Sequence, residues 1–208
     1  HKKNTKKYKL NNEQKKAFEY LDKISNKFDV SVLQGTTGSG KTLVYFERIK
    51  KIIKEKKQAL VLHPEIFLTN DFKLRFEDFF GFEPSIWHSK ITPKQKRIIW
   101  KGIIRNKIKI LVGARSALLL PFKKLGIIVV DEEHDSSYKQ QDGFRYSARD
   151  LSVMRAQYED IPILLGSATP SLESLRNCDE QRYRHLMLTK RAGSAAIPKS
   201  QTIDMRQE

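Results

Sequence analysis

Short aliphatic runs alternate along the chain with longer stretches in which apolar positions recur at helical spacing. The runs typical of strands buried on both faces are Val30–Leu33, Ala59–Leu62, Ile108–Val112, Ile127–Val130 and Ile163–Leu165. Helical stretches lie near 41–56, 68–80, 92–105, 147–158 and 171–177, and a first helix is expected to start at Asn11 or Asn12 with Ala17, Phe18 and Leu21 facing inward. This alternation predicts an α/β fold, an open and mainly parallel sheet with right-handed crossovers and helices on both faces.

The pattern divides the chain into one domain and two flanking segments. Residues 1–9 hold five lysines and predict a flexible basic tail. The domain is expected over 10–190, and 191–208 loses the periodicity and resembles a connector toward an absent second lobe. Because the sequence starts at His1 rather than Met, we expect it to be a piece of a longer protein.

The charge of the chain points toward a polyanion. With 40 basic and 24 acidic residues the formal net charge is +16, and nucleic acid is the commonest partner of such a chain. A general solubility charge is the alternative. Residues 94–109 contain seven cations and no acid, interleaved with Ile98, Ile99 and Ile103. They predict an amphipathic helix whose cationic outer face is either simply solvated or in contact with nucleic acid.

The cysteine content and the length of the apolar runs bear on location. Cys178 is the single cysteine, so neither an internal disulfide nor a Cys-rich zinc site is expected, which fits the reducing cytoplasm. The aliphatic clusters are far shorter than the roughly 20 residues of a membrane span. We therefore expect a cytoplasmic protein that does not enter a membrane.

A glycine-rich segment follows the first predicted strand and opens a helix. Residues 35–42 match the phosphate-loop pattern G-x-x-x-x-G-K-[ST] in the strand-to-helix context that the pattern requires. Such a loop points backbone N–H groups at phosphate oxygens, and the helix N-terminus adds a favourable field. Lys41 is expected to reach the β- and γ-phosphates of ATP, and the Thr42 hydroxyl to ligate Mg²⁺. The expected nucleotide-binding residues are Gly35, Thr36, Thr37, Gly38, Ser39, Gly40, Lys41 and Thr42.

An acidic box follows the fourth predicted strand. Ile127–Val130 runs directly into Asp131-Glu132-Glu133-His134, at the strand end where open α/β sheets bind ligands. An NTPase needs one carboxylate there for Mg²⁺, the expected role of Asp131, and another for the attacking water, the expected role of Glu132. His134 is a candidate polar relay. Taken alone, this box is more typical of a solvated acidic turn or a casual metal site. Together with the phosphate loop 90 residues earlier, it favours the catalytic interpretation.

A third segment makes the chain recognisable. Gly166-Ser-Ala-Thr-Pro-Ser171 follows Ile163–Leu165, and with the phosphate loop and the acidic box it resembles the first lobe of superfamily 2 DExH helicases. Four further segments restrict the resemblance to one family within this superfamily: 59–69, 112–118, 131–146 and 166–175. Over about residues 10–205 the chain is similar to the PriA-type replication-restart helicases, the primosomal protein N′ family.

The resemblance implies a function and a set of partners. The family has two RecA-like P-loop NTPase lobes that close on ATP, so this chain would be lobe 1 of an ATP-driven 3′→5′ DNA helicase of replication restart. Its partners would be forked or single-stranded DNA and the primosome and replicative-helicase loading proteins. Zinc would be held only by parts outside this chain. Because the arginine that stabilises the γ-phosphate comes from lobe 2, an isolated lobe 1 is expected to hydrolyse ATP very slowly.

The resemblance also implies roles for individual residues. Ser167 and Thr169 would couple the acidic box to DNA, and Gln14 would lie near adenine. His63 and Ala114 occupy positions where relatives are expected to carry Val and Thr. These differences leave open the details of how the chain would contact a DNA strand.

Candidate DNA contacts follow two of the predicted strands. Arg115 and Ser116, just after Ile108–Val112, are candidates for the DNA backbone, although a capping role for Ser116 is almost as consistent. An aromatic segment follows the acidic box, where side chains able to stack on bases alternate with polar and cationic ones: Tyr138, Lys139, Gln140, Gln141, Phe144, Arg145 and Tyr146. From spacing alone these aromatics would cover the lobe; the resemblance favours coupling of DNA contact to hydrolysis.

Two other functions remain open at this point. The chain could belong to a double-strand DNA translocase or restriction-type motor that moves on duplex without unwinding it. It could also be a basic nucleic-acid-binding module with a degenerate nucleotide site, against which the intact phosphate loop and acidic box argue.

Overall fold

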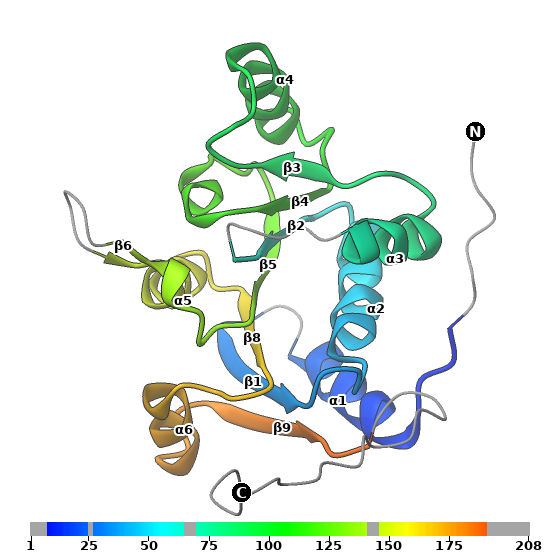
Figure 1. Cartoon of the computed structure of the whole chain (residues 1–208), viewed down its shortest axis with the longest axis vertical. Helices are drawn as coiled ribbons and strands as arrows, with labels where there is room; N and C mark the ends of the chain where they lie inside the picture. Colours follow the sequence, from blue (N-terminus) through cyan, green and yellow to red (C-terminus); the bar gives the residue numbers. More distant parts are fainter. Residues whose placement is uncertain (1–7, 25–26, 65–69, 141–145, 191–208) are drawn as a thin grey trace, which may run out of the picture.

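A seven-stranded sheet forms the centre of the computed structural model, which describes residues 8–24, 27–64, 70–140 and 146–190. The strand order is β3-β4-β2-β5-β8-β1-β9, and every neighbouring pair is parallel. The strands are β1 Asp29–Gly35, β2 Gln58–Leu62, β3 Ser85–Trp87, β4 Ile110–Gly113, β5 Leu125–Asp131, β8 Pro162–Ser167 and β9 Arg184–Leu188. The predicted parallel α/β fold is confirmed, and all seven carboxyl ends lie at one edge of the sheet (Figure 1).

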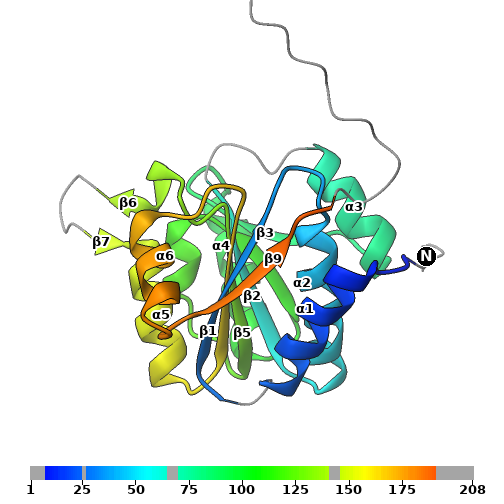
Figure 2. The ribbon, with the colours of Figure 1, turned by 90° about the horizontal axis from the view of Figure 1, so that it is seen from below.

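Helices cover both faces of the sheet, as Figures 1 and 2 show. One face carries α1 Asn12–Lys23, α2 Lys41–Lys54 and α3 Asn70–Phe80; the other carries α4 Pro93–Ile104, α5 Ala148–Tyr158 and α6 Leu172–Asp179. Successive strand residues enter opposite layers: Val61 packs with the first group, Leu60 and Leu62 with the second. Because both faces are buried, the central strands are continuous apolar runs rather than alternating ones.

Polar side chains fix where the helices begin. Asn11 caps α1 and Thr92 caps α4, each in a reciprocal pair with the glutamine three residues later. Ser147 and Ser171 cap α5 and α6. These caps satisfy N–H groups that have no partner within the helix.

The structure adds elements that the apolar pattern did not predict. β3 has only three residues, and β9 is exposed or half-buried at all of its positions except Leu188, so neither shows the long buried apolar run of the central strands. The strand predicted over Ile108–Val112 starts two residues later, because the N–H of Ile108 bonds instead to the Gly102 carbonyl after α4. An antiparallel pair, β6 Lys139–Gln140 and β7 Tyr146–Ser147, and two 3-10 turns, Arg115–Leu119 and Ser136–Tyr138, were also not predicted.

The predicted tail and connector lie largely outside the described residues, which leave out 1–7 and 191–208. Of the tail, Tyr8 is placed, and its ring stacks on Phe79 of α3. In the described ranges no helix has the length and apolar character needed to span a bilayer.

Candidate active site

The turn from β1 into α2 is built for an anion. Gly38 and Gly40 have φ of +83° and +86°, a left-handed conformation that costs a side-chain-bearing residue about 1–2 kcal/mol. A Cβ on Gly35 would lie 2.4 Å from the buried Ser39 Oγ, so the loop closes tightly on itself. The first N–H groups of α2 have no helical acceptor, and no acidic side chain stands in its first turn.

Lys41 is held inside this loop. Its Nζ donates to the Gly35 carbonyl over 2.6 Å, and the side chain is largely buried. Gln14 of α1 supports the loop from outside, because its Nε2 donates to the Ser39 carbonyl over 2.9 Å while its Oε1 accepts the N–H of Asn11. Gln14 thus lies against the phosphate loop, and both the nitrogen and the oxygen of its side-chain amide are hydrogen-bonded.

Asp131 ends β5 with its carboxylate fixed by hydrogen bonds. Tyr45 of α2 donates its hydroxyl to Oδ2 over 3.0 Å, and the N–H of Glu132 donates to Oδ1 over 3.1 Å. A second hydroxyl, that of Tyr138, donates to the main-chain carbonyl of Asp131 over 2.6 Å. Both phenols are buried, and desolvation together with the Asp131 charge raises the pKa of each well above its ordinary value. They therefore remain neutral donors.

Glu132 and His134 leave the strand toward the solvent. Glu132 has φ +49°, a left-handed conformation unusual for a residue with a side chain. His134 Nδ1 lies 3.6 Å from a Glu132 carboxylate oxygen and 2.7 Å from Ser167 Oγ. Ser167 Oγ also accepts the N–H of Thr169. The acidic box and the Ser-Ala-Thr segment are thus in direct contact through His134 and Ser167.

Glu133 lies on the buried side of the same turn. Its carboxylate accepts from the N–H of Ser171 over 2.7 Å and from the Ser174 hydroxyl over 3.2 Å, and Arg149 Nη1 lies 3.3 Å away. The three partners come from the starts of α5 and α6. The carboxylate side chain is fully buried, so this network ties the acidic box to two helices behind it.

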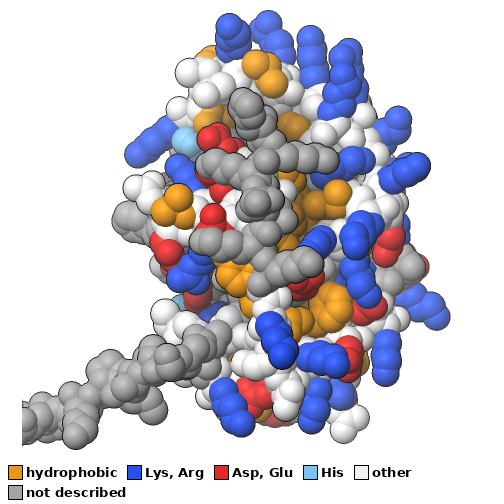
Figure 3. Space-filling model, turned by 90° about the vertical axis from the view of Figure 1, so that its right-hand side faces the viewer, with side chains coloured by type: hydrophobic (Ala, Val, Ile, Leu, Met, Phe, Trp, Pro, Cys, Tyr) orange, Lys and Arg blue, Asp and Glu red, His pale blue; other side chains and the backbone are white. Residues whose placement is uncertain are grey.

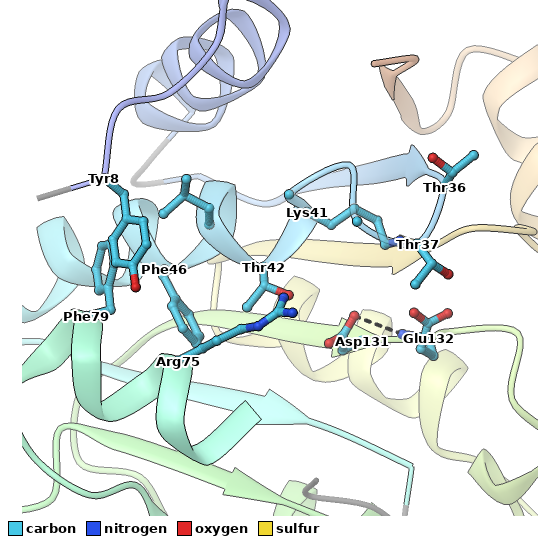
Figure 4. Close-up of a pocket in the computed structure, with 13 residues that line it drawn as sticks. Tyr8, Thr36, Thr37, Lys41, Thr42, Phe46, Arg75, Phe79, Asp131 and Glu132 are labelled. Carbon is cyan, nitrogen blue, oxygen red and sulfur yellow. Dashed lines mark hydrogen bonds between the residues drawn. The ribbon is translucent and has the colours of Figure 1, made fainter. Parts of the chain in front are cut away.

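The phosphate loop and the acidic box line one pocket of about 520 Å³. This follows from the strand order, because only β8 separates β1 from β5 and all three end at the same edge. Figure 4 shows Thr36, Thr37, Lys41 and Glu132 at one end of the pocket and the aromatic rings of Tyr8 and Phe79 at the other, with the Arg75 side chain extending between them. The pocket thus has a polar, charged end and an apolar end.

The oxygen donors of this pocket fit a divalent cation that arrives with a nucleotide. Thr42 offers a hydroxyl and Asp131 a carboxylate, and Mg²⁺ usually binds to one or two protein oxygens completed by phosphates and water. Among the described residues no cluster of three or more His, Cys, Asp or Glu side chains forms a separate metal cage.

A second pocket, of about 380 Å³, opens at the carboxyl ends of β2, β3 and β4. We call it the β2–β4 groove; its walls include His63, Trp87, His88, Lys90 and Ala114. Ser116 lies beside it, since its Oγ accepts from Trp87 Nε1 over 3.1 Å. Arg115 starts the 3-10 turn there, half-buried. His63 stands between the two pockets, with Nε2 4.0 Å from Asp131 Oδ2.

The aromatic segment is only partly described. Tyr138 is only 2% exposed, so its ring packs in the core and is not free to stack on bases, while its hydroxyl donates to the Asp131 main-chain carbonyl. Coupling of DNA contact to hydrolysis by this segment stays a prediction. Tyr146 is half-buried against the same core. Lys139 is exposed on β6. Gln141, Phe144 and Arg145 lie outside the described residues, as does the side chain of Gln140.

Several residues of the site carry no sequence signal of their own. Tyr45, Phe46, Arg75 and Phe79 belong to amphipathic helices in which the sequence pattern indicates only packing. Tyr8 falls in the segment predicted to be a flexible tail. Phe46, Arg75 and Phe79 line the pocket because α2 and α3 pack side by side on one face of the sheet (Figure 1), and Tyr45 reaches the site through its bond to Asp131.

Comparisons with known proteins agree with this geometry. The DEAD/DEAH box helicase family matches residues 11–178. Replication restart protein PriA of Rickettsia felis is 45% identical over 199 residues, which cover 96% of this chain and 30% of that protein. Replication restart protein PriA of Haemophilus influenzae is 46% identical over 199 residues, with 96% and 27% covered. The chain therefore spans less than a third of the length of these curated relatives.

A solved structure resembles the fold as well. RecG bound to a three-way DNA junction superposes with a TM-score of 0.63 at 23% identity, covering 88% of this chain and 24% of that one. At this identity the likeness concerns the fold alone.

Proposed function

The chain belongs to the DEAD/DEAH box helicase family, and from this membership we propose that it is the ATP-binding lobe of a replication-restart DNA helicase. The observation that carries the proposal is the single pocket shared by the phosphate loop, Asp131 and Glu132. The similarity to PriA over 96% of the chain supports the replication-restart role, with 3′→5′ unwinding of forked DNA and loading of the replicative helicase as the activity of the whole protein.

ATP would lie with its triphosphate at the polar end of the pocket. The N–H groups at the start of α2 would bind phosphate oxygens. Lys41 would exchange its bond to the Gly35 carbonyl for the β- and γ-phosphates. Thr42 and Asp131 would hold Mg²⁺, which neutralises charge that develops on the transferring phosphate. The base would lie toward the rings of Tyr8 and Phe79.

Glu132 would orient the attacking water. Its carboxylate lines the pocket, beside the position that the γ-phosphate would take, and His134 Nδ1 lies 3.6 Å from a Glu132 carboxylate oxygen. Hydrolysis also needs a cation opposite the loop, normally an arginine finger worth about 10³–10⁵ in rate. In two-lobe motors a second lobe supplies it, so this chain by itself should turn over very slowly.

DNA would follow the β2–β4 groove. Lys90, Arg115 and Ser116 offer cationic and hydroxyl contacts to a phosphate backbone. The β2–β4 groove adjoins the nucleotide pocket at His63, whose Nε2 lies 4.0 Å from Asp131 Oδ2. The Ser-Ala-Thr segment contacts the acidic box through the bond between Ser167 and His134. These two contacts give DNA occupancy a physical path to the carboxylates of the acidic box.

The test is the ATPase of the intact protein, measured with and without single-stranded DNA. We expect stimulation by DNA, and loss of turnover in Lys41→Ala and Glu132→Gln. Glu132→Gln should still bind ATP, because it removes only the water-orienting charge. Equal turnover with and without DNA would contradict the proposal.

A strand-separation assay on forked DNA distinguishes the main alternative. A duplex translocase would move without releasing a strand, whereas the proposed helicase releases one. A binding module with a degenerate site would show no turnover and the same DNA affinity with ATP, with ADP and without nucleotide.

A further inference from the structure

The positive charge of the chain is concentrated in one continuous part of the fold. Residues 84–130 contain eleven Lys and Arg and no Asp or Glu, and so carry eleven of the sixteen excess charges. This segment forms β3, α4 and β4 at the edge of the sheet opposite β9, and continues through the 3-10 turn Arg115–Leu119 into the central strand β5. Figure 3 shows a group of Lys and Arg side chains at the α4 end of the molecule, in addition to those spread over the rest of this face.

Four of these cations form a stripe along α4. Lys94, Arg97, Lys101 and Arg105 follow one another at spacings of three and four residues, which places them on one side of a helix. Ile103, the buried residue of α4, lies on the opposite side. All four cations are exposed. We call this surface the α4 stripe.

Several exposed cations on other helices pair with an acid one turn away, as in Lys15–Glu19, Arg75–Asp71 and Arg176–Glu180. The α4 stripe instead groups four cations on one side of a single helix. Within the described ranges no carboxylate lies within 4.0 Å of any of the four stripe cations. Their mutual repulsion is therefore uncompensated within this part of the protein.

The start of α4 strengthens the contrast. Among the described helices, only α2 and α4 have no acid in the first turn. In α2 that turn is the phosphate loop. In α4 it carries Lys94, a cation at the positive end of the helix dipole, where it is unfavourable unless an anion is nearby.

The α4 stripe adjoins the β2–β4 groove. Lys90 lies in the groove wall, and α4 begins three residues later at Pro93. The helix then runs away from the groove for about 18 Å. Ile98, which falls between Lys94 and Lys101, and Trp100 are exposed there, at 59% and 44%. A strand leaving the groove at the β3 edge would reach this surface.

We infer that the α4 stripe binds the phosphate backbone of a duplex DNA arm adjoining the single strand in the groove. The inference rests on the proposed function, because it takes the groove as the path of the single strand. Base pairing leaves mainly phosphates for α4 to contact, and a straight row of unpaired cations fits them. The contact would be independent of sequence and sensitive to salt.

The test uses the intact protein and a variant with Lys94, Arg97, Lys101 and Arg105 all changed to Gln. DNA affinity is measured against salt concentration for a bare single strand and for the same strand joined to a duplex arm. Each duplex phosphate contact contributes about 0.9 to the salt slope. We expect the slope for the armed substrate to fall by about 2–3 and its affinity at low salt by about tenfold, with the bare strand unaffected.

A matched control removes the same charge elsewhere. Lys15, Lys23, Lys54 and Arg176 are exposed cations on α1, α2 and α6, and their fourfold change to Gln should leave both slopes unchanged. An unchanged slope in the stripe variant, an equal fall in the control, or an equal fall on the bare strand would each overturn the inference. Stimulation of the ATPase by the bare strand reports separately on the proposed function.

Discussion

Removing a single hydroxyl, in Tyr45→Phe, tests how the metal-binding carboxylate is held. The phenol is buried, and its O–H is the side-chain donor to Asp131 Oδ2, 3.0 Å away. A hydrogen bond to a charged group contributes about 1.5–3 kcal/mol, and the ring itself remains in place to fill its space. In a domain of this size each kcal/mol corresponds to about 2–4 °C. We therefore expect Tyr45→Phe to lower the unfolding temperature by about 5 °C without nucleotide.

The same change should alter the response to metal. Without the phenol Asp131 is free to turn away from Thr42, so more Mg²⁺ should be needed for half-maximal binding of a fluorescent ATP analogue. Tyr158→Phe is the matched control, because Tyr158 is 92% exposed on α5 and touches neither pocket. If Tyr45→Phe unfolds at the control temperature and needs no more Mg²⁺, the hydrogen bond does not position Asp131.

Three further changes probe other parts of the account. Glu133→Gln removes the buried charge opposite Arg149 and should lower the free energy of unfolding, measured by denaturant titration, by about 3 kcal/mol. Glu132→Gln should instead abolish turnover with nearly unchanged stability. Equal stability of the two variants would contradict the structural role of Glu133. Gly113→Ala would place a Cβ 2.9 Å from the Trp87 carbonyl oxygen. The crowding should lower the free energy of unfolding by about 1–3 kcal/mol. A variant as stable as the wild type would show that the backbone of β3 and β4 moves apart without cost. Burial and the nearby Asp179 charge raise the pKa of the Cys178 thiol above its ordinary value. Its alkylation rate should therefore reach half-maximum at a higher pH than that of the same thiol in the urea-unfolded chain, and stability should fall as the pH rises between the two midpoints because the unfolded thiol ionises first. Equal midpoints would refute this.

The sequence predicts the central strands and the nucleotide-binding motifs because their signals are local. A buried strand such as Val30–Leu33 is visible as an uninterrupted apolar run, and a phosphate loop needs only the eight residues of 35–42. The parallel sheet then brings Asp131 to the same edge. The edge strands β3 and β9 lack that signal, because each is short or half-exposed.

Side-chain direction is what sequence spacing leaves undetermined. Spacing alone is consistent with Tyr138 packing on the lobe, but it does not show that the 3-10 turn at Ser136–Tyr138 directs the ring into the core. Tyr45 is one apolar position of an amphipathic helix until packing brings its hydroxyl to Asp131. The Tyr45 contact joins residues 86 positions apart in the chain. The Tyr138 contact depends on a turn that has no sequence motif.

The central claim is that the loop at 35–42 and the acidic box hold one nucleotide between them. The most direct measurement is a crystal structure of the intact Glu132→Gln variant with ATP and Mg²⁺. We expect the β- and γ-phosphates to lie against Lys41, with the metal between Thr42 and Asp131. A triphosphate bound away from either the loop or Asp131 would contradict it.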